Sequence, residues 1–262
     1  MKKTAVITGG SSGIGKSAAA LFCDAGYDVF ELSRNDCKDG TARHINCDIK
    51  RVEDIKRALL EVFSETGRLD LLINNAGMGI SGAVEFTELS DAHRIFDVNF
   101  FGAFCVIKES LPYLRKTPNS RIINVSSVAA PISIPYQAFY SATKAAINSL
   151  TLSLSNEVRT FGISVSAVMP GDTRTGFTAA RVKNTAGREL YGDAIDRAVA
   201  SMEKDEQCGM SCEYVAKLIY KVAHKKNPAP LYTAGAKYKI FTLIAKLLPA
   251  RALNWIVGKL YS

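Results

Sequence analysis

The stretch Thr8-Gly9-Gly10-Ser11-Ser12-Gly13-Ile14-Gly15 follows a short apolar run and precedes a helical pattern. Glycines at such a junction permit a tight turn and let the backbone approach a phosphate closely. The N-terminus of the next helix offers unpaired N–H groups and a partial positive charge. The stretch therefore predicts a strand–turn–helix unit that binds a pyrophosphate. On this motif alone, a plain turn between a strand and a helix is the alternative.

Apolar runs and helical patterns alternate along the rest of the chain. The predicted strands are Lys3–Thr8, Asp28–Ser33, Arg43–Cys47, Leu69–Asn74, Arg121–Ser126 and Ile163–Met169. The predicted helices are Ile14–Ala25, Val52–Ser64, Ser90–Arg115 and Ala138–Phe161. Apolar strands that alternate with helices indicate a parallel sheet covered on both faces. The predicted fold class is α/β: a doubly wound, Rossmann-like parallel sheet in a single domain, with a helical C-terminal extension.

Composition places the chain among ordinary globular proteins. Of its 262 residues, 47% are hydrophobic and 22% are charged. The six cysteines form no C-x-x-C pair and the three histidines no H-x-x-x-H pair, so we expect free thiols and no metal site. The apolar run after Met1 is too short for a signal peptide, and no long apolar stretch occurs. A cytoplasmic protein is therefore predicted.

Charge is distributed unevenly along the chain. The formal net charge is +8, yet residues 1–213 hold 24 basic and 25 acidic side chains. Residues 214–262 hold nine basic side chains and no acidic one. A nearly neutral body argues against nucleic-acid binding, whereas the positive C-terminus predicts a separate contact there.

Tyr140 and Lys144 lie four residues apart in a predicted helix and therefore share one of its faces. A tyrosine with its ordinary pKa of about 10 is a poor base at neutral pH. A nearby ammonium group favours the phenolate and lowers that pKa, which suits general acid–base catalysis. In isolation, such a pair is more often a solvated helix face.

Six motifs together resemble those of the short-chain dehydrogenase/reductase family. They are T-G-x-x-x-G-I-G at Thr8–Gly15, Asn74-Asn75-Ala76-Gly77, Asn99, Ser127, Tyr140-x-x-x-Lys144 and Pro170-Gly171. The resemblance covers residues 1–175 in order and spacing. It implies an oxidoreductase that uses a nicotinamide cofactor.

The resemblance also implies roles for individual residues. Tyr140 would exchange a proton with the reacting oxygen, Ser127 would hold that oxygen, and Asn99 would support a water-linked proton path. Lys144 would also reach the nicotinamide ribose. Ser126 is the alternative to Ser127, because neighbouring strand residues face opposite sides. The residues expected at the cofactor are Gly9, Ser11, Ser12, Gly13, Ile14, Gly15, Ser33, Arg34, Asp48, Ile49, Asn75, Ala76, Gly77, Tyr140, Lys144, Pro170, Gly171, Thr173 and Thr175.

The end of the second predicted strand bears on the choice of cofactor. In this family, NAD users carry an acidic residue there, but this chain has Ser33 followed by Arg34. A serine leaves room for a 2′-phosphate, and a guanidinium group can bind it with two hydrogen bonds. We therefore expect NADP(H), with Glu31 as the rival ribose ligand. Ser12 stands where many NADP users carry a second basic residue.

Residues 1–235 are expected to form the dinucleotide-binding oxidoreductase domain. It includes a polar, glycine-dotted substrate loop over 171–212, which is predicted to act as a lid. Apolar residues near the motifs favour a bulky hydrophobic substrate. The expected walls of this pocket are Met78, Ile80, Val128, Ala129, Ile134, Phe139 and Met169.

Residues 236–262 form a basic, amphipathic C-terminal extension. Apolar stripes run over Ile240–Leu248 and Leu253–Leu260, and Pro249 separates them. We expect the stripes to pack over the substrate cleft or against a second subunit, as helical stripes usually do. Peripheral contact with an anionic membrane is the alternative. The extension resembles those of hydroxysteroid and retinol dehydrogenases and of acyl-dihydroxyacetone-phosphate reductases.

These observations predict an NADP(H)-dependent enzyme that interconverts a secondary alcohol and a ketone. A hydroxysteroid or bile acid is the first expected substrate class, and a lipid-derived or retinoid carbonyl is the second. A non-catalytic NADP-sensing protein and a peripheral membrane protein that uses the fold as a scaffold are the other hypotheses. The family resemblance implies a homo-oligomer, either a dimer or a tetramer.

Overall fold

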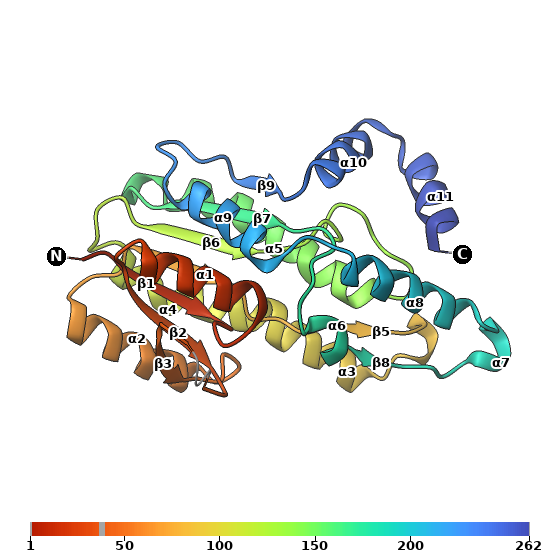
Figure 1. The fold of residues 1–262 in the computed structure, drawn as a ribbon, viewed down its shortest axis with the longest axis horizontal. Helices are drawn as coiled ribbons and strands as arrows, with labels where there is room; N and C mark the ends of the chain where they lie inside the picture. The colour runs from red at the N-terminus through yellow and green to blue at the C-terminus, as the bar shows by residue number, and fades with distance from the viewer. Residues whose placement is uncertain (1, 37–39, 262) are drawn as a thin grey trace.

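Seven parallel strands form the centre of the computed structural model, which describes residues 2–36 and 40–261 (Figure 1). Their spatial order is β3-β2-β1-β4-β6-β7-β9. The strands are β1 (Thr4–Thr8), β2 (Asp28–Ser33), β3 (Arg43–Asn46), β4 (Leu71–Asn74), β6 (Arg121–Val125), β7 (Ser164–Met169) and β9 (Leu231–Thr233). The order reverses between β1 and β4, so the loops after these two strands meet at a crevice. The predicted α/β fold class is confirmed.

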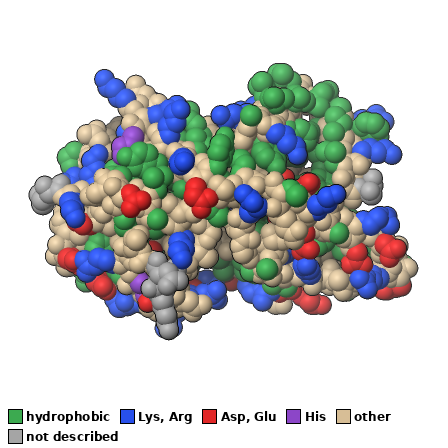
Figure 2. All heavy atoms as spheres, viewed as in Figure 1, with side chains coloured by type: hydrophobic (Ala, Val, Ile, Leu, Met, Phe, Trp, Pro, Cys, Tyr) green, Lys and Arg blue, Asp and Glu red, His purple; other side chains and the backbone are tan. Residues whose placement is uncertain are grey.

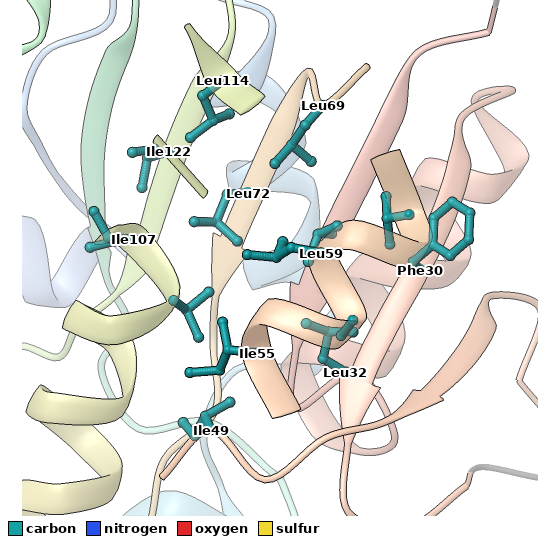
Figure 3. Close-up of a cluster of buried hydrophobic side chains, with 14 of the residues drawn as sticks. Phe30, Leu32, Ile49, Ile55, Leu59, Leu69, Leu72, Ile107, Leu114 and Ile122 are labelled. Atoms are coloured by element: carbon teal, nitrogen blue, oxygen red, sulfur yellow. The ribbon is translucent and has the colours of Figure 1, made fainter. Parts of the chain in front are cut away.

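Helices cover both faces of this sheet. On one face lie α1 (Gly13–Asp24) and α9 (Cys212–Ala223), which bury residues such as Phe22 and Ile219. On the other lie α2 (Val52–Thr66), α4 (Ala103–Leu114) and α5 (Ala138–Glu157). Figure 3 shows the core of this second face, where Leu59 of α2 and Ile107 of α4 pack near Leu72 of β4.

Local sequence sets the limits of α2. Glu53 and Asp54 lie in its first turn, where negative charge complements the positive end of the helix dipole. The apolar residues Ile55, Leu59 and Val62 recur at helical spacing and are buried. Gly67, with φ of 69°, ends the helix in the left-handed conformation that glycine adopts without strain.

The predicted long helix over Ser90–Arg115 is continuous but not uniform. It comprises α3 (Leu89–Phe96), a π-helical segment (Asp97–Gly102) and α4. Such wide turns often occur at functional sites. Here the segment carries Asn99, which it buries beneath the loop after β4.

A buried polar chain links the sheet to α5. Asn74 of β4 and Asn124 of β6 are register partners, and the amide of Asn74 donates to Asn124 Oδ1 at 3.0 Å. The amide of Asn124 in turn donates to Thr151 Oγ1 of α5 at 2.9 Å. Since buried polar groups are costly when unpaired, these bonds favour one register between the two strands.

The predicted substrate loop over 171–212 contains regular structure. It holds α6 (Phe177–Ala180), α7 (Arg188–Tyr191) and α8 (Ala194–Gln207). It also holds β8 (Val182–Lys183), which pairs with β5 (Ile80–Ser81). The prediction missed α8, whose buried residues Ile195, Ala198, Val199 and Met202 form one face.

Two helices follow β9 at the edge of the sheet, α10 (Ala236–Leu247) and α11 (Ala250–Tyr261) (Figure 1). Neither these nor the other helices in the described part of the chain are long and apolar enough to cross a membrane. The cysteines within the described ranges are free thiols, and Cys37 lies outside those ranges.

Candidate active site

A cavity of about 680 Å³ lies where the strands end, and it holds most of the predicted site residues. The loops after β1, β2, β4, β6 and β7 all contribute to its lining. The predicted residues in the lining are Gly9, Ser11, Ser12, Gly13, Ile14, Ser33, Arg34, Asp48, Ile49, Asn75, Ala76, Gly77, Ser127, Tyr140, Lys144, Pro170, Gly171, Thr173 and Thr175. Of the predicted site, Gly15 and Asn99 lie outside it.

The glycine turn forms one end of the cavity. The N-terminus of α1 begins after Ser12, whose side chain makes no capping hydrogen bond to the first turn. The backbone donors of that turn are therefore not satisfied by their own cap, which fits an anionic phosphate. Gly15 lies behind the turn, where an added Cβ would be 2.2 Å from the Gly9 carbonyl oxygen. Gly15 therefore packs closely behind the turn, and its predicted contact with the cofactor stays a prediction.

Asn75, in the loop after β4, is hydrogen-bonded to the glycine turn that follows β1. Its amide donates to the carbonyl oxygens of Gly9 at 3.0 Å and of Thr8 at 3.2 Å. The Thr8 hydroxyl accepts hydrogen bonds from the backbone N–H groups of Asn75 and Ala76. These bonds fix the two loops that meet at the crevice.

The end of β2 presents Ser33 and Arg34 to the cavity, whereas Glu31 lies outside its lining. Glu31 is buried, and one carboxylate oxygen contacts His44 and accepts a hydrogen bond from the Ser33 hydroxyl at 3.2 Å. The same carboxylate, His44 and Asp36 bring their ligand atoms within 4.8 Å of one another. Glu31 thus lies behind Ser33, outside the lining of the cavity.

Asp48 and Ile49 form a further wall next to the Ser33 side. The Asp48 carboxylate accepts a hydrogen bond from the Lys50 backbone at 3.0 Å, and Ile49 is buried. An added Cβ on Gly102 would be 2.8 Å from Ile49 Cδ1, so this wall packs directly on the π-helical segment. Asp48 thus belongs to the turn ahead of α2, whose N-cap position is occupied by Arg51.

Tyr140 and Ser127 meet at the other end of the cavity. The Ser127 hydroxyl hydrogen-bonds with the Tyr140 phenol and accepts from the backbone N–H of Ala129 at 3.1 Å. Ser126 also lines the cavity, but its hydroxyl donates to the Lys144 carbonyl oxygen at 3.2 Å. Of the two serines, Ser127 is therefore the one placed to hold an oxygen atom beside the phenol.

The Lys144 ammonium lies 5.7 Å from the centroid of the Tyr140 ring. It donates a hydrogen bond to the Val125 carbonyl oxygen at 2.8 Å, at the end of β6. Both residues come from α5, one turn apart, as the sequence spacing predicts. The lysine is buried, and burial lowers its pKa from 10.5 to about 8.

The expected lowering of the Tyr140 pKa is not what the structure shows. Burial raises the pKa of Tyr140 from 10 to about 12, because the charged phenolate loses its contact with water. The Ser127 hydrogen bond opposes this shift only in part, and Glu206 adds to it through its negative charge. The phenol is therefore protonated at neutral pH and is suited to donate a proton.

Asn99 supports the site from below. Its carbonyl oxygen accepts from the Met78 N–H at 2.8 Å, and its amide donates to the Met78 oxygen at 2.9 Å and to Thr143 at 3.2 Å. The side chain is therefore committed to the loop after β4 and to α5. The Asn99 side chain thus positions these two elements, and its predicted place in a proton path stays a prediction.

The loop after β7 carries Thr173 and Thr175. The hydroxyl of Thr173 donates to the Gly171 carbonyl oxygen at 2.9 Å, while that of Thr175 accepts from the Phe177 N–H at 3.1 Å. Thr175 also lies close to the glycine turn, 3.5 Å from an added Cβ on Gly13. This loop thus spans the cavity between the phosphate end and Tyr140.

The substrate end of the cavity includes residues that the sequence did not indicate. The Phe177 ring lies 5.6 Å from the Tyr140 ring, and Met202 and Glu206 of α8 line the same wall. Tyr261 of α11 closes the lining from the C-terminal extension. Four expected wall residues, Met78, Val128, Ala129 and Ile134, line the cavity, whereas Ile80, Phe139 and Met169 lie outside it.

A buried ion pair holds the substrate loop together. Arg181 pairs with Glu206 of α8, and the Thr178 hydroxyl donates to the second oxygen of Glu206 at 2.6 Å. The Arg181 side chain is almost fully buried and lies 5.8 Å from the Phe177 ring. These contacts join Arg181 and α6 to α8 within the loop, and its predicted action as a lid stays a prediction.

A dinucleotide-binding crevice that ends at a serine, a tyrosine and a lysine defines a nicotinamide-dependent oxidoreductase. A family model described as "short chain dehydrogenase" matches residues 3–186. The chain belongs to the short-chain dehydrogenase family.

Individual relatives support this placement. A protein of Bacteroides thetaiotaomicron named 3-ketodihydrosphingosine reductase is 37% identical over 254 residues, which cover 96% of this chain and 92% of that one. The crystal structure of a short-chain dehydrogenase from Streptomyces avermitilis has a TM-score of 0.86 at 26% identity, with 98% of this chain and 96% of that chain covered. A structure titled "ElxO with NADP Bound" has a TM-score of 0.76 at 26% identity, covering 92% and 100%.

Proposed function

We propose that this chain is an NADPH-dependent reductase that converts a hydrophobic, lipid-derived ketone into a secondary alcohol. The observation that carries the proposal is the placement of Ser127 and a protonated Tyr140 in one cavity with the glycine turn. When bound, NADPH supplies the hydride that attacks the carbonyl carbon. Tyr140 gives its proton to the carbonyl oxygen, and Ser127 holds that oxygen while negative charge develops.

The choice of NADPH rests on the end of β2. Ser33 and Arg34 line the cavity, and the acidic rival Glu31 is engaged with His44 outside it. A guanidinium group next to a small hydroxyl residue suits a 2′-phosphate, which NADPH carries and NADH lacks.

The proposed substrate class rests on the end of the cavity that lies opposite Ser33 and Arg34. Apolar side chains such as Met78, Val128, Phe177 and Met202 dominate the wall beyond Tyr140. The relative named 3-ketodihydrosphingosine reductase, similar along almost the whole chain, favours a long-chain ketone over the hydroxysteroid or bile acid expected first from sequence.

A substrate panel tests this proposal. NADPH absorbance is followed with 3-ketodihydrosphingosine, a shorter aliphatic ketone, ketosteroids and keto bile acids, and each assay is repeated with NADH. We expect fastest turnover of the long-chain ketone, and a Tyr140→Phe variant about 10²- to 10⁴-fold slower. Faster turnover of a steroid would assign the other substrate class. A biological function that survives Tyr140→Phe would instead indicate the non-catalytic, cofactor-sensing role.

A further inference from the structure

Helix α10 presents its apolar face to solvent. Ile240, Leu243, Ile244 and Leu247 are exposed by 62%, 59%, 43% and 77%, and their spacing places them on one side of the helix. The opposite side meets the protein through Thr242, which is buried and hydrogen-bonded to Thr233 of β9. Helices on the surface of a soluble protein normally turn their apolar side toward the protein. The exposed apolar side of α10 therefore indicates a site for a binding partner.

Helix α11 also exposes apolar side chains. Its inner side carries the buried Val257 and the cavity residue Tyr261, while Trp255 and Leu260 are exposed by 65% and 57%. Figure 2 shows hydrophobic atoms gathered over this region of the molecule, with lysine and arginine side chains beside them. We call the surface formed by the exposed apolar residues of α10 and α11 the apolar plateau: Ile240, Leu243, Ile244, Leu247, Trp255 and Leu260.

Charge around the apolar plateau has one sign. Residues 214–262 contain nine basic residues and no acidic one, whereas residues 1–213 are nearly neutral. Lys239 and Lys246 of α10 and Arg251 and Lys259 of α11 are all exposed. A basic rim around exposed aliphatic residues and a tryptophan complements the anionic headgroups and acyl boundary of a lipid bilayer. The basic rims of two copies of this chain would repel each other at the same plateau.

The apolar plateau also borders the cavity. Tyr261 lines the cavity next to α8, and Leu260, its neighbour, belongs to the plateau. At the other end of the extension, the Tyr238 ring of α10 packs on Gly171, where an added Cβ would be 2.4 Å from the ring. Helix α11 therefore contributes to both the cavity wall and the exposed surface, while α10 packs behind that wall at Gly171.

We propose that the apolar plateau docks on the surface of an anionic lipid bilayer, with α10 and α11 lying in the plane of the headgroups. The bilayer is the source from which a lipid-derived ketone reaches the cavity past α11. This delivery role rests on the proposed function, whereas the docking itself does not.

Vesicle sedimentation of the full chain tests the docking. The probes are phosphatidylcholine vesicles with and without phosphatidylglycerol, at low and high salt, without substrate. We expect sedimentation with the anionic vesicles that weakens at high salt. A Leu243→Glu, Leu247→Glu double variant should lose at least about tenfold in binding, because two aliphatic side chains that would enter the bilayer are replaced by carboxylates.

Matched controls identify the surface. Leu60 and Leu190 lie elsewhere on the protein and are exposed by 58% and 71%. The Leu60→Glu, Leu190→Glu variant therefore makes the same change of charge as the plateau variant, at leucines of similar exposure. That variant should bind vesicles like the unmodified chain. A Lys239→Glu, Lys246→Glu variant should lose the preference for phosphatidylglycerol.

Three outcomes would overturn the proposal. They are no sedimentation of the unmodified chain, equal losses in both leucine variants, or a plateau variant that changes only the oligomeric state in size-exclusion chromatography. The last would make a second copy of the chain the occupant. Because sedimentation is measured without substrate, failure of the proposed reductase activity would leave these results unchanged. The circular dichroism spectrum and melting temperature of the plateau variant check that it is folded.

Discussion

The Tyr238 hydroxyl of α10 donates a hydrogen bond to the carboxylate of Asp172, in the loop after β7. Burial raises the pKa of Asp172, and the Tyr238 hydrogen bond opposes that shift. Since Asp172 also lines the cavity, the C-terminal extension is tied to a wall of the active site.

Tyr238→Phe should loosen this connection while keeping the ring on Gly171. Loss of one hydrogen bond to a charged group costs about 1.5–3 kcal/mol of unfolding free energy. We expect a lower melting temperature and earlier proteolytic cleavage in α10. Tyr214→Phe, at a tyrosine that is 49% exposed, is the control and should change neither. Equal proteolysis of both variants would show that the bond does not hold the extension.

Arg34→Ala should weaken NADPH far more than NADH. Loss of a charge-assisted contact to the 2′-phosphate should raise the KM for NADPH about 10- to 100-fold and leave the KM for NADH unchanged. Arg51→Ala, at an exposed arginine outside the cavity lining, is the matched control. Initial rates with both cofactors provide the measurement, and a parallel loss with NADH would remove Arg34 from the selectivity argument.

Gly15→Ala should disrupt the crevice. The added methyl group would be 2.2 Å from the Gly9 oxygen and 2.5 Å from the Asn75 amide, so the loops after β1 and β4 must separate. We expect a loss of about 3 kcal/mol or more in unfolding free energy and loss of NADPH binding by fluorescence titration. Gly258→Ala in α11 meets nothing within 4 Å and should be neutral or stabilising by up to about 1 kcal/mol.

Lys144 predicts a particular dependence of stability on pH. Its folded-state pKa of about 8 lies below the ordinary lysine value of 10.5, so below pH 8 the charged amine is buried at its full cost. Between these two values the folded protein releases its proton first. The lysine's contribution to unfolding free energy therefore rises with pH, by about 3 kcal/mol in total.

Denaturant titrations of the unmodified chain and of Lys144→Met, at intervals from pH 7 to about pH 10, measure this contribution as a difference. The advantage of the variant over the unmodified chain should shrink as pH rises. Tyr140 acts in the opposite sense only above pH 10, because its pKa is raised to about 12. A difference that does not vary with pH would contradict the burial of a charged Lys144.

The sheet and the cofactor end could be predicted because their signals are local. Strand Asp28–Ser33 and the start of α5 at Ala138 have the predicted bounds, and the glycine turn lies where the sequence places it. The alternation of side chains along a strand predicted that Ser126 and Ser127 face opposite sides. In the structure, the Ser126 hydroxyl bonds to the backbone carbonyl of Lys144 and the Ser127 hydroxyl to Tyr140.

Features that depend on tertiary surroundings were not predicted. Lys144 was expected to lower the Tyr140 pKa, but spacing along a helix does not reveal how deeply the phenol is buried. The spacing of Ile195, Val199 and Met202 could have indicated α8, although its many charged residues obscure the pattern. The stripe in α10 was expected to pack over the substrate cleft or against a second subunit. In the single chain it is exposed, because periodicity alone does not say which side of a helix meets the rest of its own chain.

The hydrogen-bond chain from Asn74 through Asn124 to Thr151 has a consequence for assembly of the sheet. If β4 slipped by one residue against β6, Asn124 would lose its partner and an amide would be stranded among aliphatic side chains. A slipped pairing of β4 and β6 is therefore less stable than the observed one. The same register fixes the relative positions of the loops that follow these strands, one carrying Asn75 and the other Ser127, independently of any bound small molecule.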